Sequence, residues 1–340
     1  MTRTQLGLLL GGLLLLLGLF LLSMATGAGT YGMPALLGYL MGDDQLRADD
    51  KLAMILNTLR GPRTLCALLV GSSLAVAASL LQNATRNPLA EPGLLGVNAG
   101  AVLGLVLGLT YAGIGSTLGY LLWSGAGALI GNLLVLGLGG LFSVGRPLQL
   151  ILVGVALNAI FGGLSSFLLL SHQVVLDQFR FWDLGSVADA DRQAILLITP
   201  LVLLAFLLGL SLCRGLTLLQ MGDAQAQALG LHTNRLRLGV LLASTLLTAG
   251  AVSLAGPIGF LGFLAAYGAR QIEPVSLSRQ LLFSALGGSL LLLLADILAR
   301  WLIQPFELAD GTLLALLGAP LLIALVWRGQ GPLVTGEPHR

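Results

Sequence analysis

Residues 59–101 read LRGPRTLCALLVGSSLAVAASLLQNATRNPLAEPGLLGVNAGA, which is two apolar runs separated by a compact polar turn. The first run, 62–82, has the roughly 20 residues that a helix needs to cross the hydrocarbon core of a bilayer. The turn between the runs contains Asn87-Pro88 and Glu91-Pro92-Gly93, both strong turn signals. Because unpaired peptide groups do not occur in lipid, the pattern predicts two membrane spans joined by a turn that lies in water or packs on protein.

The rest of the 340-residue chain has the same character. Apolar residues make up 56% of it and charged residues 9%, and the mean hydropathy is +0.94. Soluble domains carry about 25% charged residues, so lipid must be the solvent for this chain. The 47 glycines suit closely packed membrane helices. Ten runs are candidate spans: 5–25, 62–82, 94–113, 115–138, 149–170, 193–213, 238–255, 258–270, 281–303 and 312–327.

The predicted fold is therefore all-α, a single polytopic transmembrane domain over residues 1–340 with about ten spans. Ala25-Thr26-Gly27 resembles a signal cleavage site, but a signal core usually has 7–15 apolar residues, so we interpret 5–25 as an uncleaved first span. The eighth run, 258–270, is short and follows Gly256-Pro257, which predicts a broken or tilted helix.

Loop charges predict the orientation, because cytoplasmic loops carry an excess of Lys and Arg. With a cytoplasmic N-terminus and alternating spans, ten of the 17 Lys and Arg residues fall on the cytoplasmic side and seven on the outer side. An even number of spans also returns the C-terminus to the cytoplasm. The outer loops are then about 26–60, 171–192 and 304–311, and the longest cytoplasmic loop is 214–237.

The sequence lacks the motifs that several classes of protein require. The one lysine, Lys51, lies in no GxxxxGK[ST] phosphate loop, so the chain cannot hydrolyse ATP by that route. Cys66 and Cys213 form no metal spacing and are expected to be packing residues. The three histidines lie in loops and make no catalytic cluster, the net charge of +2 indicates no nucleic-acid partner, and no cofactor or metal site is expected.

An ion-coupled secondary transporter remains an alternative, because such proteins carry ionisable residues at mid-membrane. Asp296 is the one acidic residue within a predicted span. It lies four residues before Arg300, so the two side chains could instead pair on one helix face. An intramembrane enzyme is a weaker alternative.

Loop 214–237 contains the signals of a short helix. Gly222-Asp223 predicts its start, with Asp223 as the N-cap. Ala226 and Leu229 are expected on one face, and Gly230 can end the helix in the left-handed conformation. By themselves, these signals describe an ordinary amphipathic loop.

Six stretches, in order along nearly the whole chain, resemble the permeases of the iron-siderophore and cobalamin importers (FecCD type). They are the run 59–101, LDQFRFWDLGSV (176–187), GDAQAQALGLHTNRLRL (222–238), AGPIGFLGF (255–263), LLLADILAR (292–300) and LLGAPLLIALVWR (316–328). The resemblance implies a ten-span, cobalamin-importer-permease-like subunit in the bacterial inner membrane, and no enzymatic activity of its own.

The same resemblance implies partners. A second permease subunit, identical or paralogous, would complete the pore. Two ATPase subunits, which bind ATP and Mg²⁺, would lie at the cytoplasmic face, and a periplasmic substrate-binding protein would lie above. FRFWDLGS resembles the siderophore branch, so the expected cargo is a ferric siderophore, with cobalamin or haem as the alternatives.

The family also suggests site residues. The coupling segment, which would contact the ATPase, maps onto Gly222, Asp223, Ala226, Leu229, Gly230 and Leu231. Docking of the binding protein maps onto Arg60, Arg63 and Arg300, which would pair with its glutamates at the outer surface. Arginines at helix ends also serve as interfacial anchors, and that reading stays open.

The translocation path is expected along the fifth span. Its polar face carries Asn158, Gly162, Ser165 and Ser166, a pattern that helix packing would explain equally well. Arg180, in the outer loop, could attract an anionic ferric complex.

Three departures from the family put local geometry in doubt. They are Gly61 in place of leucine, 266–270 (AYGAR) in place of Pro-His-x-Ala-Arg, and 307–311 (ELADG) in place of Glu-Leu-Pro-x-Gly.

Overall fold

The computed structural model of the chain describes residues 3–27, 31–88, 90–138, 147–302 and 307–327. Within these ranges every regular element is a helix. Seven helical stretches are long and apolar enough to cross a membrane by themselves. The helices concerned are α1 (Arg3–Ala25), α5 (Gly61–Thr85), α7 (Thr117–Leu138), α8 (Pro147–Ser171), α10 (Arg192–Leu219), α12 (Thr233–Ala255) and α14 (Leu277–Leu302).

Three shorter apolar helices complete the set. They are α6 (Val97–Leu107), which a π-helical turn η3 (Gly108–Ala112) extends, α13 (Leu261–Ile272) and α15 (Asp310–Trp327). Together the ten helices match the ten predicted segments in order, so the predicted fold class is confirmed. α10 runs to Leu219, six residues beyond the predicted end of its span at 213.

The eighth segment is broken, as its length predicted. Residues 256–260 are not helical, and α13, which follows them, has 12 residues. The backbone N–H of Phe260, just before α13, donates to the carboxylate of Glu91 at 3.1 Å. Glu91 belongs to the polar turn after α5, so this turn packs on protein, one of its two predicted environments. Its helical part is η2 (Pro92–Leu95).

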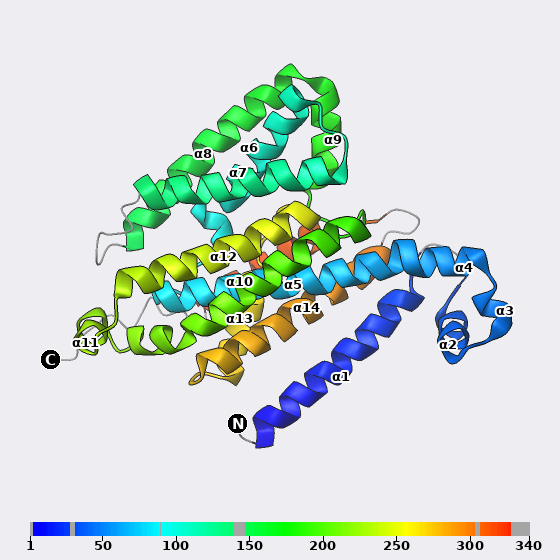
Figure 1. Ribbon diagram of the computed structural model, residues 1–340, viewed down its shortest axis with the longest axis horizontal. Coiled ribbons are helices and arrows are strands. Elements are labelled where there is room, and N and C mark those ends of the chain that lie inside the picture. The colour runs from blue at the N-terminus through cyan, green and yellow to red at the C-terminus, as the bar shows by residue number, and fades with distance from the viewer. Residues whose placement is uncertain (1–2, 28–30, 89, 139–146, 303–306, 328–340) are drawn as a thin grey trace.

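The centre of the molecule is the crossing of α5 and α14. An added Cβ at Gly71 would lie 2.4 Å from the carbonyl oxygen of Gly288, and one at Gly288 would lie 2.1 Å from that of Gly71. Glycine at both positions therefore permits the close approach of the two backbones. In Figure 1, α10, α12 and α14 run beside α5, whereas α1 lies along the outside of α14. The most apolar window of 50–85 is 78% buried, against 11% for α1.

Helices α6, α7 and α8 form a second layer, which contacts the first through α12 (Figure 1). A short amphipathic helix, α9 (Gln173–Asp183), follows α8 within the predicted loop 171–192. Its Phe179 is 7% exposed, and the rings of Phe179 and Trp182 lie 6.2 Å apart. These aromatic side chains attach α9 to the end of the second layer.

Most of the predicted outer loop before α5 is helical. It contains α2 (Met33–Met41), α3 (Asp44–Arg47), α4 (Asp50–Met54) and a π-helical stretch η1 (Ile55–Arg60), and the last two run directly into α5. The second span was therefore predicted to begin about 12 residues too late. The physical cause is a capped, amphipathic start: the Asp49 side chain accepts from two N–H groups of α4, while Leu52 and Leu56 are buried.

Both cysteines are free and buried, as expected for packing residues. Of the predicted outer loop 304–311, residues 304–306 lie outside the described part of the chain, as does the predicted C-terminal segment after residue 327.

Candidate functional site

Two ends of the helical layers carry the candidate site residues. We call them the α11 end, after α11 (Asp223–Ala228), and the α4 end, which holds α2, α3 and α4. Figure 1 shows these ends on opposite sides, with the start of α1 on the side of α11. Gln5 near that start donates to the carbonyl oxygen of Ile272 at the end of α13. The N-terminal part of α1 and the predicted coupling segment therefore lie on the same side of the molecule.

Asp223 is the centre of the α11 end. It was predicted to be the N-cap of the short helix, but Gly222 occupies that position and Asp223 is the first helical residue. Its carboxylate accepts from Arg86, after α5, at 2.9 Å and from Arg237, in α12, at 3.0 Å. Because its oxygens bind these two guanidinium groups, the side chain ties α11 to two membrane helices instead of capping α11.

The end of α11 is a Schellman motif. Gly230 has φ +83°, and its N–H donates to Gln227, while the N–H of Leu231 donates to Ala226. The predicted left-handed stop at Gly230 is confirmed. Leu231 packs against the large apolar cluster between α5, α10 and α12.

Ala226 and Leu229 do not share an environment. Ala226 is fully buried within the chain itself, whereas Leu229 is 62% exposed and Met221 is 63% exposed. The expectation that Ala226 and Leu229 lie on one face is therefore wrong, because Ala226 packs inward on the helices that hold α11 while Leu229 is exposed. The apolar surface that α11 leaves to a partner is carried by Leu229 and Met221.

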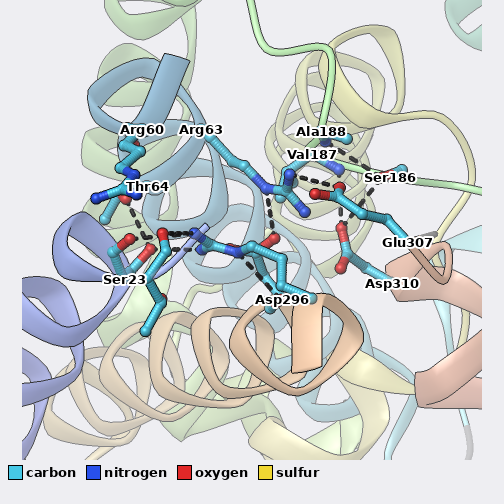
Figure 2. A network of polar contacts seen from close by, with 12 residues as sticks. Ser23, Arg60, Arg63, Thr64, Ser186, Val187, Ala188, Asp296, Glu307 and Asp310 are labelled. Atoms are coloured by element: carbon cyan, nitrogen blue, oxygen red, sulfur yellow. Dashed lines mark hydrogen bonds and ion pairs between the residues drawn. The ribbon is translucent and has the colours of Figure 1, made fainter. Parts of the chain in front are cut away.

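At the α4 end, Asp296 of α14 lies between two arginines. Arg63 Nε is 2.7 Å from one of its oxygens, and Arg300 Nη2 contacts the other. Figure 2 shows these side chains converging from α5 and α14 between the helices. The predicted pairing of Asp296 with Arg300 is confirmed.

The three arginines of this end are buried. Arg60, Arg63 and Arg300 have 4%, 8% and 5% of their surface exposed. Arg60 donates to the carbonyl oxygens of Met24 and Tyr31, and Arg300 to that of Ser23, so both hold the end of α1. The three side chains are buried because acidic groups and carbonyl oxygens of the same chain surround them, and their docking role stays a prediction.

Two further carboxylates balance the cluster. Glu307 accepts from Arg63 at 2.7 Å, and Asp310 at the start of α15 accepts from the N–H of Val187 at 2.8 Å. With Asp296 they place three carboxyl groups beside the three arginines (Figure 2). Sequence reasoning treated 307–311 as a departure from a motif and missed the contacts of Glu307 with Arg63 and of Asp310 with Val187. The sequence signal for these two residues is a pair of acids just before an apolar run.

The α8 residues proposed for the path divide between two environments. Ser165 is 2% exposed and Asn158 is half-buried, and each has a buried oxygen without a hydrogen-bond partner in the described part of the chain. Ser166 is exposed, Gly162 has open space beside it, and Arg180 is exposed on α9. The predicted two-turn spacing places Asn158 and Ser165 on the same buried side, while pore and packing roles both remain predictions.

Metal chemistry finds no support among the described residues. Nowhere in these ranges do three or more His, Cys, Asp or Glu side chains gather in a way that could hold a metal ion.

The chain is similar to known transport proteins along almost its whole length. The model of the FecCD transport family matches residues 14–328. The ferric enterobactin transport system permease protein FepD of Escherichia coli is 40% identical, with 94% of each chain covered. The hemin transport system permease protein HmuU of Yersinia pestis is 36% identical, covering 96% of this chain and 97% of its own.

A solved structure has the same architecture. It is described as a metal-chelate type ABC transporter in an inward-facing conformation. The TM-score is 0.82 at 30% identity, and the match covers 95% of this chain and 99% of the other.

Proposed function

The chain belongs to the FecCD transport family, and we propose that it is the permease subunit of an ATP-driven importer that carries a ferric siderophore across the bacterial inner membrane. A permease role fits the seven helices of the described residues that are long and apolar enough to cross a membrane, because they provide a transmembrane body.

The proposed cargo is inferred from one observation, which is the whole-length similarity to permeases whose names specify iron complexes. The enterobactin permease shares 40% of its residues with this chain over 94% of its length. Hemin is the second candidate, because the hemin permease covers a slightly larger share of both chains at 36% identity. Both cargoes are iron chelates, which agrees with the metal-chelate type of the similar structure.

The energy source must be a partner. The sequence has one lysine and no phosphate loop, so ATP hydrolysis belongs to separate ATPase subunits. We place them against the α11 end, where Leu229 and Met221 expose apolar surface beside a helix fixed to α5 and α12 by Asp223. A fixed helix can transmit the movement of a partner to the membrane helices, whereas a mobile loop would absorb it.

The remaining partners follow from this orientation. The α11 end and the N-terminus would face the cytoplasm, and a substrate-binding protein would dock at the α4 end, above a pore completed by a second permease subunit. Docking through Arg63 and Arg300 would require these side chains to leave Asp296, which pairs with both. Arg60 would have to release the carbonyl oxygens of Met24 and Tyr31.

The experiment is an uptake assay with competing cargoes. Cells that lack the gene and cells that carry it on a plasmid are given an iron-55 ferric siderophore, hemin or cobalt-57 cobalamin. We expect siderophore uptake to depend on the gene and the other two to be unaffected. Gene-dependent hemin or cobalamin uptake without siderophore uptake would contradict the proposed cargo, and ATP-independent uptake in proteoliposomes would contradict the proposed class.

A further inference from the structure

A polar cavity lies at the α11 end, away from the predicted translocation residues of α8. Its volume is about 230 Å³, and it lies between the ends of α5, α10, α13 and the start of α14. The side chains around it are amides, guanidinium groups and one proline: Gln82, Asn83, Arg86, Gln220, Arg270, Pro274 and Gln280. No carboxylate is among these lining residues.

Two of the side chains that line this cavity are buried amides with unused donors. Gln82 is fully buried and Gln280 is 2% exposed, and the Nε2 of each has no hydrogen-bond acceptor in the described part of the chain. The orientation of Gln82 is fixed, because its Oε1 accepts from Arg270 at 3.3 Å. A buried N–H₂ group without an acceptor is costly, so these two side chains favour an acceptor-rich occupant.

The rim differs from this interior. The Oδ1 of Asn83 accepts from Gln220 at 2.9 Å, and its Nδ2 donates to the carbonyl oxygen of Ser79 at 2.7 Å. The amide of Asn83 is therefore satisfied within the protein, and the unused donors are confined to the buried wall.

The charge around the cavity is positive. Arg270 makes its hydrogen bond, among the described residues, to the neutral Gln82. The nearby Glu273 is committed elsewhere: it accepts from Ser276 and Val275 N–H groups and pairs with Arg279 at 3.2 Å. These bonds, first that of the Ser276 N–H, hold the pKa of the Glu273 carboxyl below its ordinary value, so it stays ionised with its own partners.

Arg86 connects the cavity with the coupling segment. Its Nη2 donates to Asp223 at 2.9 Å, while 41% of its side chain stays exposed at the mouth. An anion at this mouth would share Arg86 with Asp223.

We propose that this cavity binds an oxyanion of the phosphate class, held by Arg86, Arg270 and the Nε2 groups of Gln82 and Gln280. The volume is several times the roughly 30 Å³ that one water occupies in the liquid, so a phosphate group fits. Guanidinium groups match phosphate oxygens in geometry as well as charge, and the two buried lining atoms without a partner, the Nε2 groups of Gln82 and Gln280, are donors. The phosphate can be free or belong to a lipid headgroup. Anion binding itself does not depend on the proposed function. Only the meaning of the shared Arg86 for the coupling segment rests on that function.

The test uses purified full-length permease in detergent. Thermal unfolding is followed while inorganic phosphate replaces chloride at constant ionic strength, and separately while phosphatidylglycerol is added. We expect a saturable rise in the unfolding temperature with one of the two ligands. Arg270→Gln should raise the apparent dissociation constant at least tenfold, and Gln280→Glu, which keeps the volume but adds a negative charge, should abolish the rise.

Arg214→Gln is the matched control, because Arg214 is an exposed arginine of α10 that does not line the cavity. It should keep the wild-type response. Saturation by inorganic phosphate identifies a free-anion site, and saturation by the phospholipid alone identifies a lipid site; both support the proposal. Absence of any rise in the wild type, or an equal rise in Gln280→Glu, would overturn it. Unfolding temperatures in chloride report separately on the fold of each variant.

Discussion

The two ends of this molecule use arginine in opposite ways. At the α4 end, Arg60, Arg63 and Arg300 are at most 8% exposed, and carboxylates of the same chain pair with Arg63 and Arg300. At the α11 end, Arg86 keeps 41% of its side chain exposed, and Arg270 binds a neutral glutamine.

This difference in burial and pairing of the arginines gives the two ends different properties. Buried, neutralised arginines crosslink α1, α5 and α14, and removing one partner leaves an uncompensated charge away from water. Half-exposed arginines beside unused amide donors can accept a ligand or a partner at little cost to the fold. The α4 end therefore holds helices together, and the α11 end is where we propose contact with other molecules.

The largest expected effect is at the α4 end. Asp296→Ala leaves Arg63 and Arg300 without the carboxylate that both contact, and loss of a buried partner costs about 3–5 kcal/mol. We expect a loss of this size in the free energy of unfolding of the detergent-solubilised permease. Glu307→Gln is the control: Glu307 also pairs with Arg63, but its side chain is 38% exposed, so about 0–1 kcal/mol is expected. Equal losses in the two variants would remove the distinction between buried and exposed partners.

A smaller effect is expected at Arg60. Arg60→Gln removes hydrogen bonds to the carbonyl oxygens of Met24 and Tyr31 and should destabilise the isolated permease by about 1–3 kcal/mol. Salt separates this structural role from docking, because the Debye length falls from about 10 Å at 0.1 M to 3 Å at 1 M. The stability loss should persist in 1 M salt.

Arg192→Gln serves as its control, since Arg192 is an exposed arginine at the start of α10. If Arg60→Gln unfolds like the wild type but binds the substrate-binding protein more weakly, and if high salt reduces that defect, Arg60 is a docking residue.

The smallest effect on stability is expected at the α11 end. Leu229→Glu changes a side chain that is 62% exposed, so the free energy of unfolding should move by less than about 0.5 kcal/mol. Uptake should nevertheless fall at least tenfold, because a charge would be placed in the proposed apolar contact with the ATPase. Unfolding and uptake are measured on the same preparation.

Ala226→Glu should instead lower the free energy of unfolding, because Ala226 is fully buried and its replacement should disturb the fold of the loop itself. Normal uptake by Leu229→Glu would contradict the placement of the ATPase on this surface.

Some parts of the site were readable from the sequence because their signals are local. The left-handed stop at Gly230 follows from one residue type after a short helical pattern, and the pairing of Asp296 with Arg300 follows from a spacing of four on one helix. The role of Asp223 was not readable, because its partners Arg86 and Arg237 are 137 and 14 residues away. Local capping chemistry predicted an N-cap, and tertiary ion pairs placed the carboxylate elsewhere.

The sequence by itself determined that lipid surrounds the chain, the order of the ten segments, the break in the eighth, and the lack of a phosphate loop in these 340 residues. Hydropathy, glycine and proline signals and the missing phosphate loop are properties of short stretches, so they survive without knowledge of the fold. Only the tertiary structure decided which arginines are neutralised. Arg63 meets Asp296 and Glu307 across 233 and 244 residues of chain, and Gln82 meets Arg270 across 188. Burial and pairing depend on which helix faces meet. Close contacts such as the one between Gly71 and Gly288 decide this, and the sequence does not show which residue a given glycine will contact.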